Sequence, residues 1–225
     1  MDQDTIGKVA DATGEIAKTA DTALKLVGKF GFAFKGALNT AGNMIDNEIK
    51  FIAARRALSL SDKWETLMVA RGFAAPTRPL PPNFVVPLLV TAVLEEDDEL
   101  QDTWARLLVN AGDATTQMEL RTAYVEILKG MSAFDVKNLA AMAKASLAMP
   151  SGKPRAVLTI DLPASSKAFP GHFEKPPTIS RELGISLANL SRLGCAMPAG
   201  GTDGAVLYTI MTVTDLGLAL YQACS

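Results

Sequence analysis

The residues best suited to catalysis or metal binding in this sequence are one histidine and two cysteines. His172 lies in a stretch rich in proline and glycine, and Cys195 and Cys224 lie near the end of the chain. A histidine can activate a cysteine when a third group orients the pair, and zinc sites use closely spaced ligands. The sequence supplies neither pattern. We therefore interpret His172 as a loop residue and Cys195 as a buried thiol, and we predict no catalytic residues, no metal site and no cofactor.

Five consecutive acidic residues, Glu95 to Glu99, form the densest group of oxygen ligands, and Asp102 follows them. Such clusters bind Mg²⁺ or Ca²⁺ when their spacing suits the ion, but the spacing here matches no EF-hand loop. Acidic residues in the first turn of a helix stabilise it through the helix dipole. We therefore predict that the run caps the helix that carries Leu100 and Trp104.

Composition places the chain among globular intracellular proteins. Of its 225 residues, 48% are hydrophobic and 20% are charged, and the net charge is −2. No stretch approaches the roughly 20 apolar residues that cross a bilayer, and acidic residues interrupt the start of the chain where a signal peptide would be apolar. We expect a cytoplasmic protein with reduced cysteines, with peripheral attachment to the inner membrane as an option.

Residues 4–58 carry the clearest helical periodicity in the sequence. Apolar side chains recur every three or four positions, and the same register places the charged residues on the opposite side. Six glycines in this segment each cost a helix about 1 kcal/mol, so we predict a long amphipathic helix that needs a covering surface. The predicted self-association or membrane face consists of Ile6, Val9, Ile16, Val27, Phe30, Phe34 and Met44.

Basic residues accompany the second half of this predicted helix. Lys25, Lys29 and Lys35 are candidates to face a membrane, because lysines beside aromatic residues favour an anionic lipid surface. The alternative is that the helix docks on its own protein or on other copies of itself. We favour a homo-oligomer or a helical protein partner, and we keep an anionic membrane as the second option.

The rest of the sequence predicts a mainly α fold with a central helical bundle and a small C-terminal α+β module. We expect Ser59 to cap a helix that ends near Gly72, and four prolines over 76–82 to form an extended connector. Further helices are predicted over 84–94, from Leu100, over about 117–130 and over about 133–148. The predicted domains are an N-terminal amphipathic segment (1–58), a helical core (59–149), a linker (150–177) and a winged-helix-like module (178–225).

The C-terminal module is predicted from its order of elements. A short strand over 157–162 lies in the linker, a helix follows over 186–193, and glycines over 200–204 form a turn without any nucleotide-binding pattern. A strand over 206–213 comes next, and Thr214 caps a final helix that reaches Tyr221. This order is typical of a winged-helix-like unit.

The central part reads PPNFVVPLLVTAVLEEDDELQDTWARLLVNAGD from Pro81, then YVEILKGMSAFD, and the C-terminal part contains LSRLGCAMP and YTIMTVTDLGLAL. These stretches resemble the bacterial abortive infection alpha (Abi-alpha) family over roughly residues 60–224. The resemblance implies a role in phage defence by abortive infection, and the family has no established catalytic residues. Members commonly carry His-Pro where this sequence has Arg121-Thr122, just before Tyr124, so no role of that histidine carries over.

We therefore expect a non-enzymatic component of phage defence that acts by self-association, partner docking or membrane perturbation through its N-terminal helix. The alternative is a DNA-binding transcriptional regulator that uses the winged-helix-like module, with Arg181 and Arg192 on phosphate. Phosphate contacts supply most of the affinity in such complexes, and the module is poor in lysine and arginine. We favour protein docking and do not expect nucleic acid as a partner.

Overall fold

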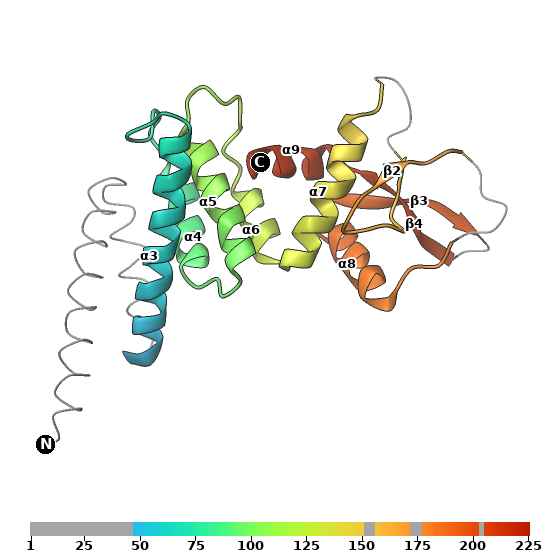
Figure 1. Ribbon diagram of the computed structural model, residues 1–225, viewed down its shortest axis with the longest axis horizontal. Helices are drawn as coiled ribbons and strands as arrows, with labels where there is room; N and C mark the ends of the chain where they lie inside the picture. Colours follow the sequence, from blue (N-terminus) through green and yellow to red (C-terminus); the bar gives the residue numbers. More distant parts are fainter. Residues whose placement is uncertain (1–46, 151–155, 172–176, 203–204) are drawn as a thin grey trace, which may run out of the picture. The chain divides into compact units, whose positions relative to one another are not determined.

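The computed structural model describes residues 47–150, 156–171, 177–202 and 205–225 (Figure 1). The chain divides into two compact units, Met1–Val125 and Glu126–Ser225, here called the first and the second unit. The described residues are mainly helical, with a small antiparallel sheet of four strands in the second unit. The long amphipathic helix predicted at the N-terminus lies largely outside the described residues.

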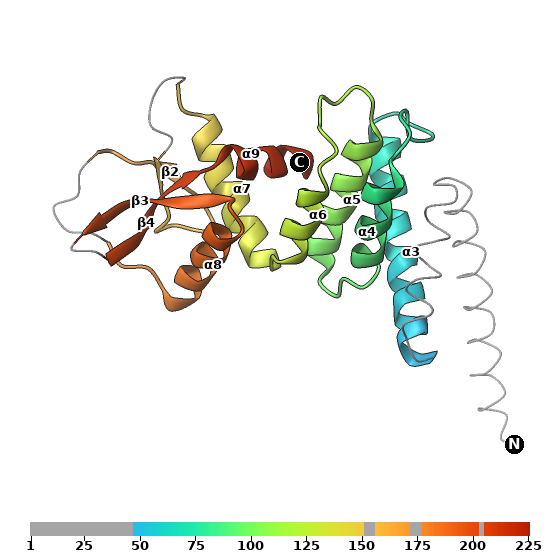
Figure 2. The ribbon, with the colours of Figure 1, turned by 180° about the vertical axis from the view of Figure 1, so that it is seen from behind.

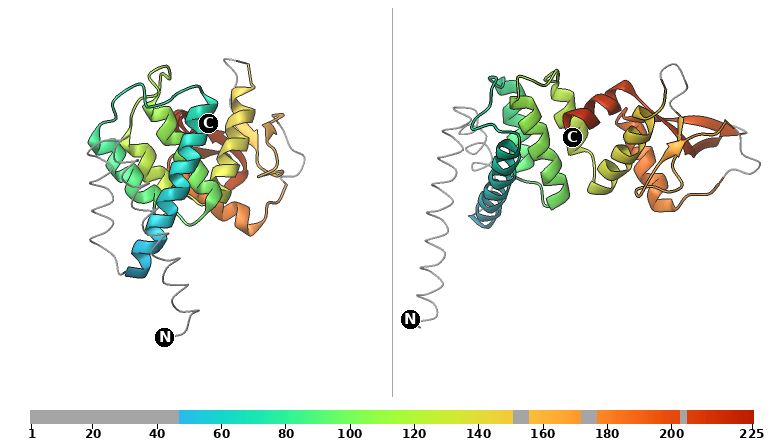
Figure 3. Two further views of the ribbon diagram at one scale, coloured as in Figure 1. Left: turned by 60° about the vertical axis from the view of Figure 1, so that its left-hand side comes forward. Right: turned by 45° about the horizontal axis from the view of Figure 1, so that its top comes forward.

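The described part of the first unit is built from helices. They are α3 (Asn47–Ala70), α4 (Pro82–Ala92), α5 (Asp98–Gly112) and α6 (Thr122–Lys129), of which α6 continues into the second unit. Helix α3 lies alongside α5, and α4 also packs on α5 (Figure 3). The buried side chains of α3 recur at helical spacing: Ala57, Leu60, Trp64 and Met68. This stripe joins the buried face of α5 around Trp104, because both helices are amphipathic.

Ser59 does not cap a helix, so that prediction was wrong. Helix α3 (Asn47–Ala70) runs through Ser59 without interruption, because the alanines and arginines ahead of it favour helix. The Ser59 hydroxyl instead donates to Gln101 Oε1 of α5 at 2.7 Å. Gln101 Nε2 in turn donates to the Arg56 carbonyl oxygen at 3.2 Å, so two polar side chains join the helices.

Prolines determine where α4 starts. Pro81 is its N-cap, with extended backbone angles (φ −62°, ψ 136°), and Pro82 occupies the first turn, where a missing amide hydrogen is harmless. The helix contains Pro87 and no charged residue. Its fully buried side chains are Phe84, Val85, Leu88, Leu89 and Ala92.

The acidic run begins α5 as predicted. Asp97 is the N-cap, and its Oδ1 accepts hydrogen bonds from the backbone N–H groups of Glu99 and Leu100, both at 2.9 Å. Asp98 and Glu99 lie in the first turn, where their charge stabilises the positive end of the helix dipole. Helix α6 starts at Thr122, later than the predicted 117, because residues 113–121 form turns and extended chain.

The second unit combines three further helices with the sheet. Its elements are α7 (Ala133–Leu147), β1 (Ala156–Leu158), β2 (Lys167–Ala168), α8 (Arg181–Arg192), β3 (Ala196–Thr202), β4 (Ala205–Val213) and α9 (Asp215–Ala223). The strands are antiparallel in the order β2-β1-β4-β3, and β3 and β4 form a hairpin (Figure 2). Helices α7 and α8 pack against each other and contact the sheet, and their core contains Leu139, Met142, Leu187, Leu190, Val157 and Met211.

Three predicted boundaries in the second unit need correction. The strand predicted over 157–162 ends at Leu158, because Asp161 and Pro163 direct the chain into turns. Helix α8 begins at Arg181, earlier than the predicted 186, because the Ser180 side chain caps it by accepting from Leu183 N at 3.1 Å. Gly200 and Gly201 belong to β3, where they pair with Leu207 and Val206.

The end of the chain agrees with its prediction. Thr214 caps α9, and its hydroxyl oxygen accepts from Gly217 N at 3.0 Å. The same hydroxyl donates to the Gly194 carbonyl oxygen at 2.6 Å, which joins the start of α9 to the turn after α8. A Cβ atom at Gly217 would lie 2.0 Å from the Cys195 carbonyl oxygen, so only glycine fits there.

Candidate functional site

The predicted association face lies outside the described residues. This holds for its apolar members Ile6, Val9, Ile16, Val27, Phe30, Phe34 and Met44, and for the basic candidates Lys25, Lys29 and Lys35. His172 also lies outside them. Four groups of side chains within the described ranges were therefore compared as candidate sites.

Cys195 is buried after the end of α8, as the sequence predicted for a structural thiol. Burial raises the pKa of this thiol from 9.0 to about 12, so it stays protonated at neutral pH and is a poor nucleophile. Neither cysteine forms a disulfide. Among the described residues, no group of three or more His, Cys, Asp or Glu side chains is arranged to hold a metal ion.

The first group is an arginine cluster at the C-terminal end of α5, made of Arg71, Arg78, Asn110 and Asp113. Arg78 comes from the proline-rich connector before α4 and donates to three carbonyl oxygens, Ala111 at 2.5 Å, Met118 at 3.2 Å and Asn110 at 3.3 Å. The last carbonyls of a helix lack partners within it and carry partial negative charge. Arg78 satisfies them, so its guanidinium holds the connector on the end of α5.

Asp113 is the buried anion of this cluster, with 5% of its surface exposed. Its Oδ1 accepts from the Thr115 hydroxyl at 2.6 Å and from Thr115 N at 2.8 Å, and Arg71 Nη1 lies 3.9 Å from its Oδ2. The hydrogen bond from the Thr115 side chain is the largest cause that lowers the pKa of Asp113; the Thr115 amide and the charges of Arg71 and Arg78 add to it, and burial opposes them. The carboxylate therefore stays ionised and fixes the turn after α5.

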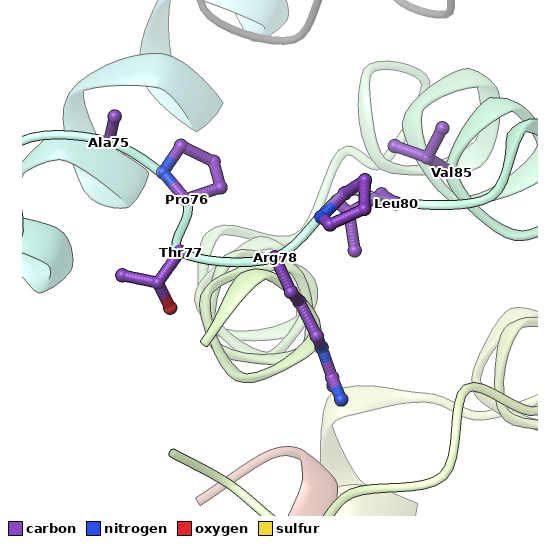
Figure 4. A pocket seen from close by; sticks show the side chains of 7 residues that line it. Ala75, Pro76, Thr77, Arg78, Leu80 and Val85 are labelled. Atoms are coloured by element: carbon purple, nitrogen blue, oxygen red, sulfur yellow. The ribbon is translucent and has the colours of Figure 1, made fainter. Parts of the chain in front are cut away.

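A pocket of about 420 Å³ lies beside the connector (Figure 4). Its lining consists of Ala75, Pro76, Thr77, Arg78, Pro79, Leu80 and Val85. Figure 4 shows the Arg78 side chain running away from the connector, and its Nε donates to the Ala111 carbonyl oxygen. Thr77 is also used within the fold, because its Oγ1 accepts from Ala114 N at 2.8 Å. The polar side chains of Thr77 and Arg78 are thus both engaged within the fold.

The second group is an aspartate network in the second unit, made of Ser132, Asp135, Asn138, Ser186 and Asn189. Asp135 Oδ2 accepts from Ser132 N at 2.8 Å, from Ser132 Oγ at 2.9 Å and from Asn189 Nδ2 at 3.0 Å. Its Oδ1 accepts from Ser186 Oγ at 2.5 Å, and Asn138 Nδ2 donates to the same hydroxyl at 2.9 Å. Asp135, Asn138 and Ser186 are all buried.

This aspartate network joins the start of α7 to the middle of α8. Ser132 and Asp135 form a reciprocal capping box, a pattern that the spacing Ser-x-x-Asp signals in the sequence. The sequence predicted the helix, but this cap and the two α8 side chains that complete it were not predicted. Because its donors are directed at one carboxylate inside the unit, we interpret the network as structural.

The third group is the exposed side of α8, where the sequence predicted phosphate contacts. Arg181 and Arg192 are both exposed, and Ile185 between them is 62% exposed. The Arg192 guanidinium donates to Asn189 Oδ1 from Nη2 at 2.7 Å and from Nε at 3.1 Å, and Glu182 is exposed next to Arg181. An apolar residue between two arginines, with an acid alongside, resembles a protein-docking surface more than a phosphate-binding one.

The fourth group is an apolar stripe on the outer side of α4 and of the turn after it, formed by Asn83, Val86, Pro87, Val90 and Leu94 and called the α4 stripe. Its three central residues are half-buried, and Leu94 is 44% exposed. A helix that is apolar all round is normally covered on every side. This surface was not predicted from the sequence, although an eleven-residue helix without charge was its signal.

None of the helices that the structure describes has the length and apolar character needed to cross a membrane. A family model described as abortive infection alpha matches residues 56–224, which confirms the family that the sequence resembles. No curated protein and no solved structure matched the chain.

Proposed function

Because the chain belongs to the abortive infection alpha family, we propose that it is a phage-defence component that acts by physical association and not by catalysis. The family supplies the abortive-infection role. The observation that carries the mode of action is the N-terminal sequence pattern, in which a broad apolar face over residues 4–46 contains no charged side chain. A surface of this kind binds another apolar surface, either in a protein or in a membrane.

The polar clusters of the two units support an associative role. In the arginine cluster, Arg78 binds carbonyl oxygens of its own unit, and Asp113 binds Thr115. In the aspartate network, Asp135 accepts from neighbouring side chains. Groups used in this way are ordinarily structural, since catalytic groups must reach a substrate. Exposed apolar side chains include Leu94 of the α4 stripe and Ile185 of α8.

We further propose that the second unit is a winged-helix-like module that docks on a protein. Helix α8 directly precedes the β3–β4 hairpin, and β1 pairs with β4, an order that suits this description. Ile185, exposed between Arg181 and Arg192, would be the central contact. Nothing that we observe favours the DNA-binding alternative.

The proposal is tested by charging the apolar N-terminal face in bacteria that express the full chain. Ile16→Asp and Phe30→Asp place a carboxylate on that face, and Thr22→Asp places the same group on its charged side. We expect the first two variants to lose at least tenfold in protection against phage, measured as plaque number, while Thr22→Asp retains protection. Equal protection by all three variants would refute an associative role of this segment.

The form of association is separated with purified protein. Light scattering reports the mass in solution, and sedimentation with vesicles that contain phosphatidylglycerol reports lipid binding. If the segment drives self-association, Ile16→Asp lowers the mass; if it contacts the membrane, the variant no longer sediments with vesicles. An unchanged mass and unchanged sedimentation would mean that the segment does neither.

A further inference from the structure

We propose that the α4 stripe is the docking surface for residues 22–45 of the same chain, which cover it until the protein is activated. This inference rests on the proposed function, because it assigns a resting position to the segment that drives association. It also adds a regulatory step: release of the segment uncovers both the α4 stripe and the apolar face of residues 22–45.

The stripe has the geometry of a helix contact. Val86 and Val90 are four residues apart on one side of α4, and Leu94 follows in the turn after the helix, which ends at Ala92. Pro87 adds to the row, and Asn83 at its end is the one polar member. Rows of this kind form the ridges that pack into the grooves of a neighbouring helix.

Residues 22–45 match the stripe in apolar character and in charge. Their apolar face includes Val27, Phe30 and Phe34, and the stretch contains three lysines and no acidic residue. The acidic run Glu95 to Glu99 follows Leu94 immediately, at one end of the stripe. Lysines on the docked segment would therefore lie near carboxylates, whereas the same carboxylates would repel an anionic lipid surface.

Covalent connection favours the same chain over a second copy. Residue 46 is followed directly by α3, α3 packs on α5, and α5 packs on α4. A segment tethered so close has an effective concentration in the millimolar range, well above the usual concentration of a second copy in a cell. Residues 22–45 would span roughly 36 Å as a helix and α4 spans roughly 16 Å, so one part of the segment can cover the stripe.

The inference is tested by photo-crosslinking in the full chain. Val90 is replaced with p-benzoyl-phenylalanine, and Val69 of α3, which is 74% exposed, receives the same residue as a matched control. Irradiation of a mixture of unlabelled and ¹⁵N-labelled protein, followed by peptide mass spectrometry, identifies the partner and shows whether one chain or two are joined.

We expect the residue-90 probe to join peptides from residues 22–45 within one chain, and at least fivefold less of this product from the residue-69 probe. Joining between labelled and unlabelled chains would overturn the inference and indicate a contact between copies. Loss of the product on adding phosphatidylglycerol vesicles would support release, whereas absence of the product in buffer alone would overturn the inference.

A proteolysis experiment provides a second measurement. Val90→Asp is expected to speed tryptic cleavage after Lys25, Lys29 and Lys35 at least fivefold, because the segment loses its cover, and Val69→Asp is expected to leave the rate unchanged. Equal rates in the wild type and both variants would contradict docking.

Failure of the inference and failure of the proposed function are distinguishable. If Ile16→Asp abolishes protection while the residue-90 probe joins two chains, the segment acts by association but rests elsewhere. If Ile16→Asp retains protection while the intramolecular product forms, the segment docks on α4 but does not carry the function.

Discussion

The two units offer different kinds of surface to a partner. In the first unit, α4 carries no charged residue, and Val90 on its outer side and Leu94 in the turn after it are accessible. In the second unit, the outer strands of the sheet are poorly suited to adding a further strand. Pro198 in β3 lacks a backbone donor, and β2 has two residues, one of them Lys167. Association through a helix face is therefore favoured over association through a sheet edge.

The two units also differ in how far their polar contacts are exposed to solvent. Helix α3 is joined to α5 by charged side chains near the surface, since Lys63 Nζ lies 2.5 Å from Asp102 Oδ1 and Arg56 Nη1 lies 3.2 Å from Asp98 Oδ1. Helix α7 is joined to α8 by the buried Asp135. Exposed ion pairs contribute little and are screened by salt, whereas buried networks are costly to disrupt. The first unit is therefore expected to open more easily.

The largest effect is expected in the aspartate network. Asp135→Ala removes the acceptor of the buried Ser186 hydroxyl, of the half-buried Asn189 amide and of the capping donors of Ser132, so we expect the second unit to lose about 3–4 kcal/mol of unfolding free energy. Circular dichroism in urea should show this loss. Tryptophan fluorescence should change less, because Trp64 and Trp104 both belong to the first unit.

The control for Asp135 is Asp161→Ala, which removes an exposed acid of the same unit. We expect a change within about 0.5 kcal/mol. If the two variants unfold at the same urea concentration, the buried Asp135 network does not stabilise the second unit more than an exposed acid does.

The next largest effect is expected at Gly217, which tests how tightly the second unit is packed. Gly217→Ala brings a methyl group against the Cys195 carbonyl, and we expect about 2–3 kcal/mol of destabilisation. Gly184→Ala in α8 is the matched control, because its nearest neighbour would be Ile179 Cδ1 at 3.9 Å. That variant should be stabilised by up to about 1 kcal/mol. Equal thermal midpoints for the two would contradict this packing.

A smaller effect on stability is expected from the shifted pKa values of Asp113 and Cys195, and it depends on pH. Asp113 has a lowered pKa, so its stabilisation of the first unit is present above 3.8 and is lost as the pH falls below that value. Cys195 has a raised pKa, so its contribution to the second unit is present below 9.0 and is lost as the pH rises toward 12. Urea midpoints measured across pH should show that Asp113→Asn flattens the acid limb and Cys195→Ala the alkaline limb. Unchanged slopes would argue against both assignments.

The smallest effect is expected where α3 meets α5. Lys63→Ala removes contacts to Asp102 and to the Asp98 carbonyl oxygen, and we expect a loss of about 0.5–1 kcal/mol that shrinks in high salt. Tryptophan fluorescence in urea at low and high salt measures it. A loss of unfolding free energy as large as that of Asp135→Ala would show that the polar contacts of the two units are equally stabilising.

Local signals in the sequence predicted where some of the helices begin, whereas the predicted starts of α3, α6 and α8 were wrong. The acidic run identified the start of α5, the prolines identified the connector, and Thr214 identified the start of α9, because caps and prolines act on the nearest backbone. The family was also readable from the sequence, since its stretches keep their order along the chain. The sequence likewise suggested a buried Cys195, and the structure adds the raised pKa that follows from burial.

Only the tertiary structure revealed which side chains meet across distant positions. Asp135 with Ser186 and Asn189, Arg78 with the end of α5, and the Cys195 carbonyl against Gly217 join residues that no sequence period connects. The tertiary structure also shows which side of α4 packs against the unit and which side stays accessible. Periodicity reports which residues share a face, but packing decides which faces are covered, because burial depends on the whole chain around each helix.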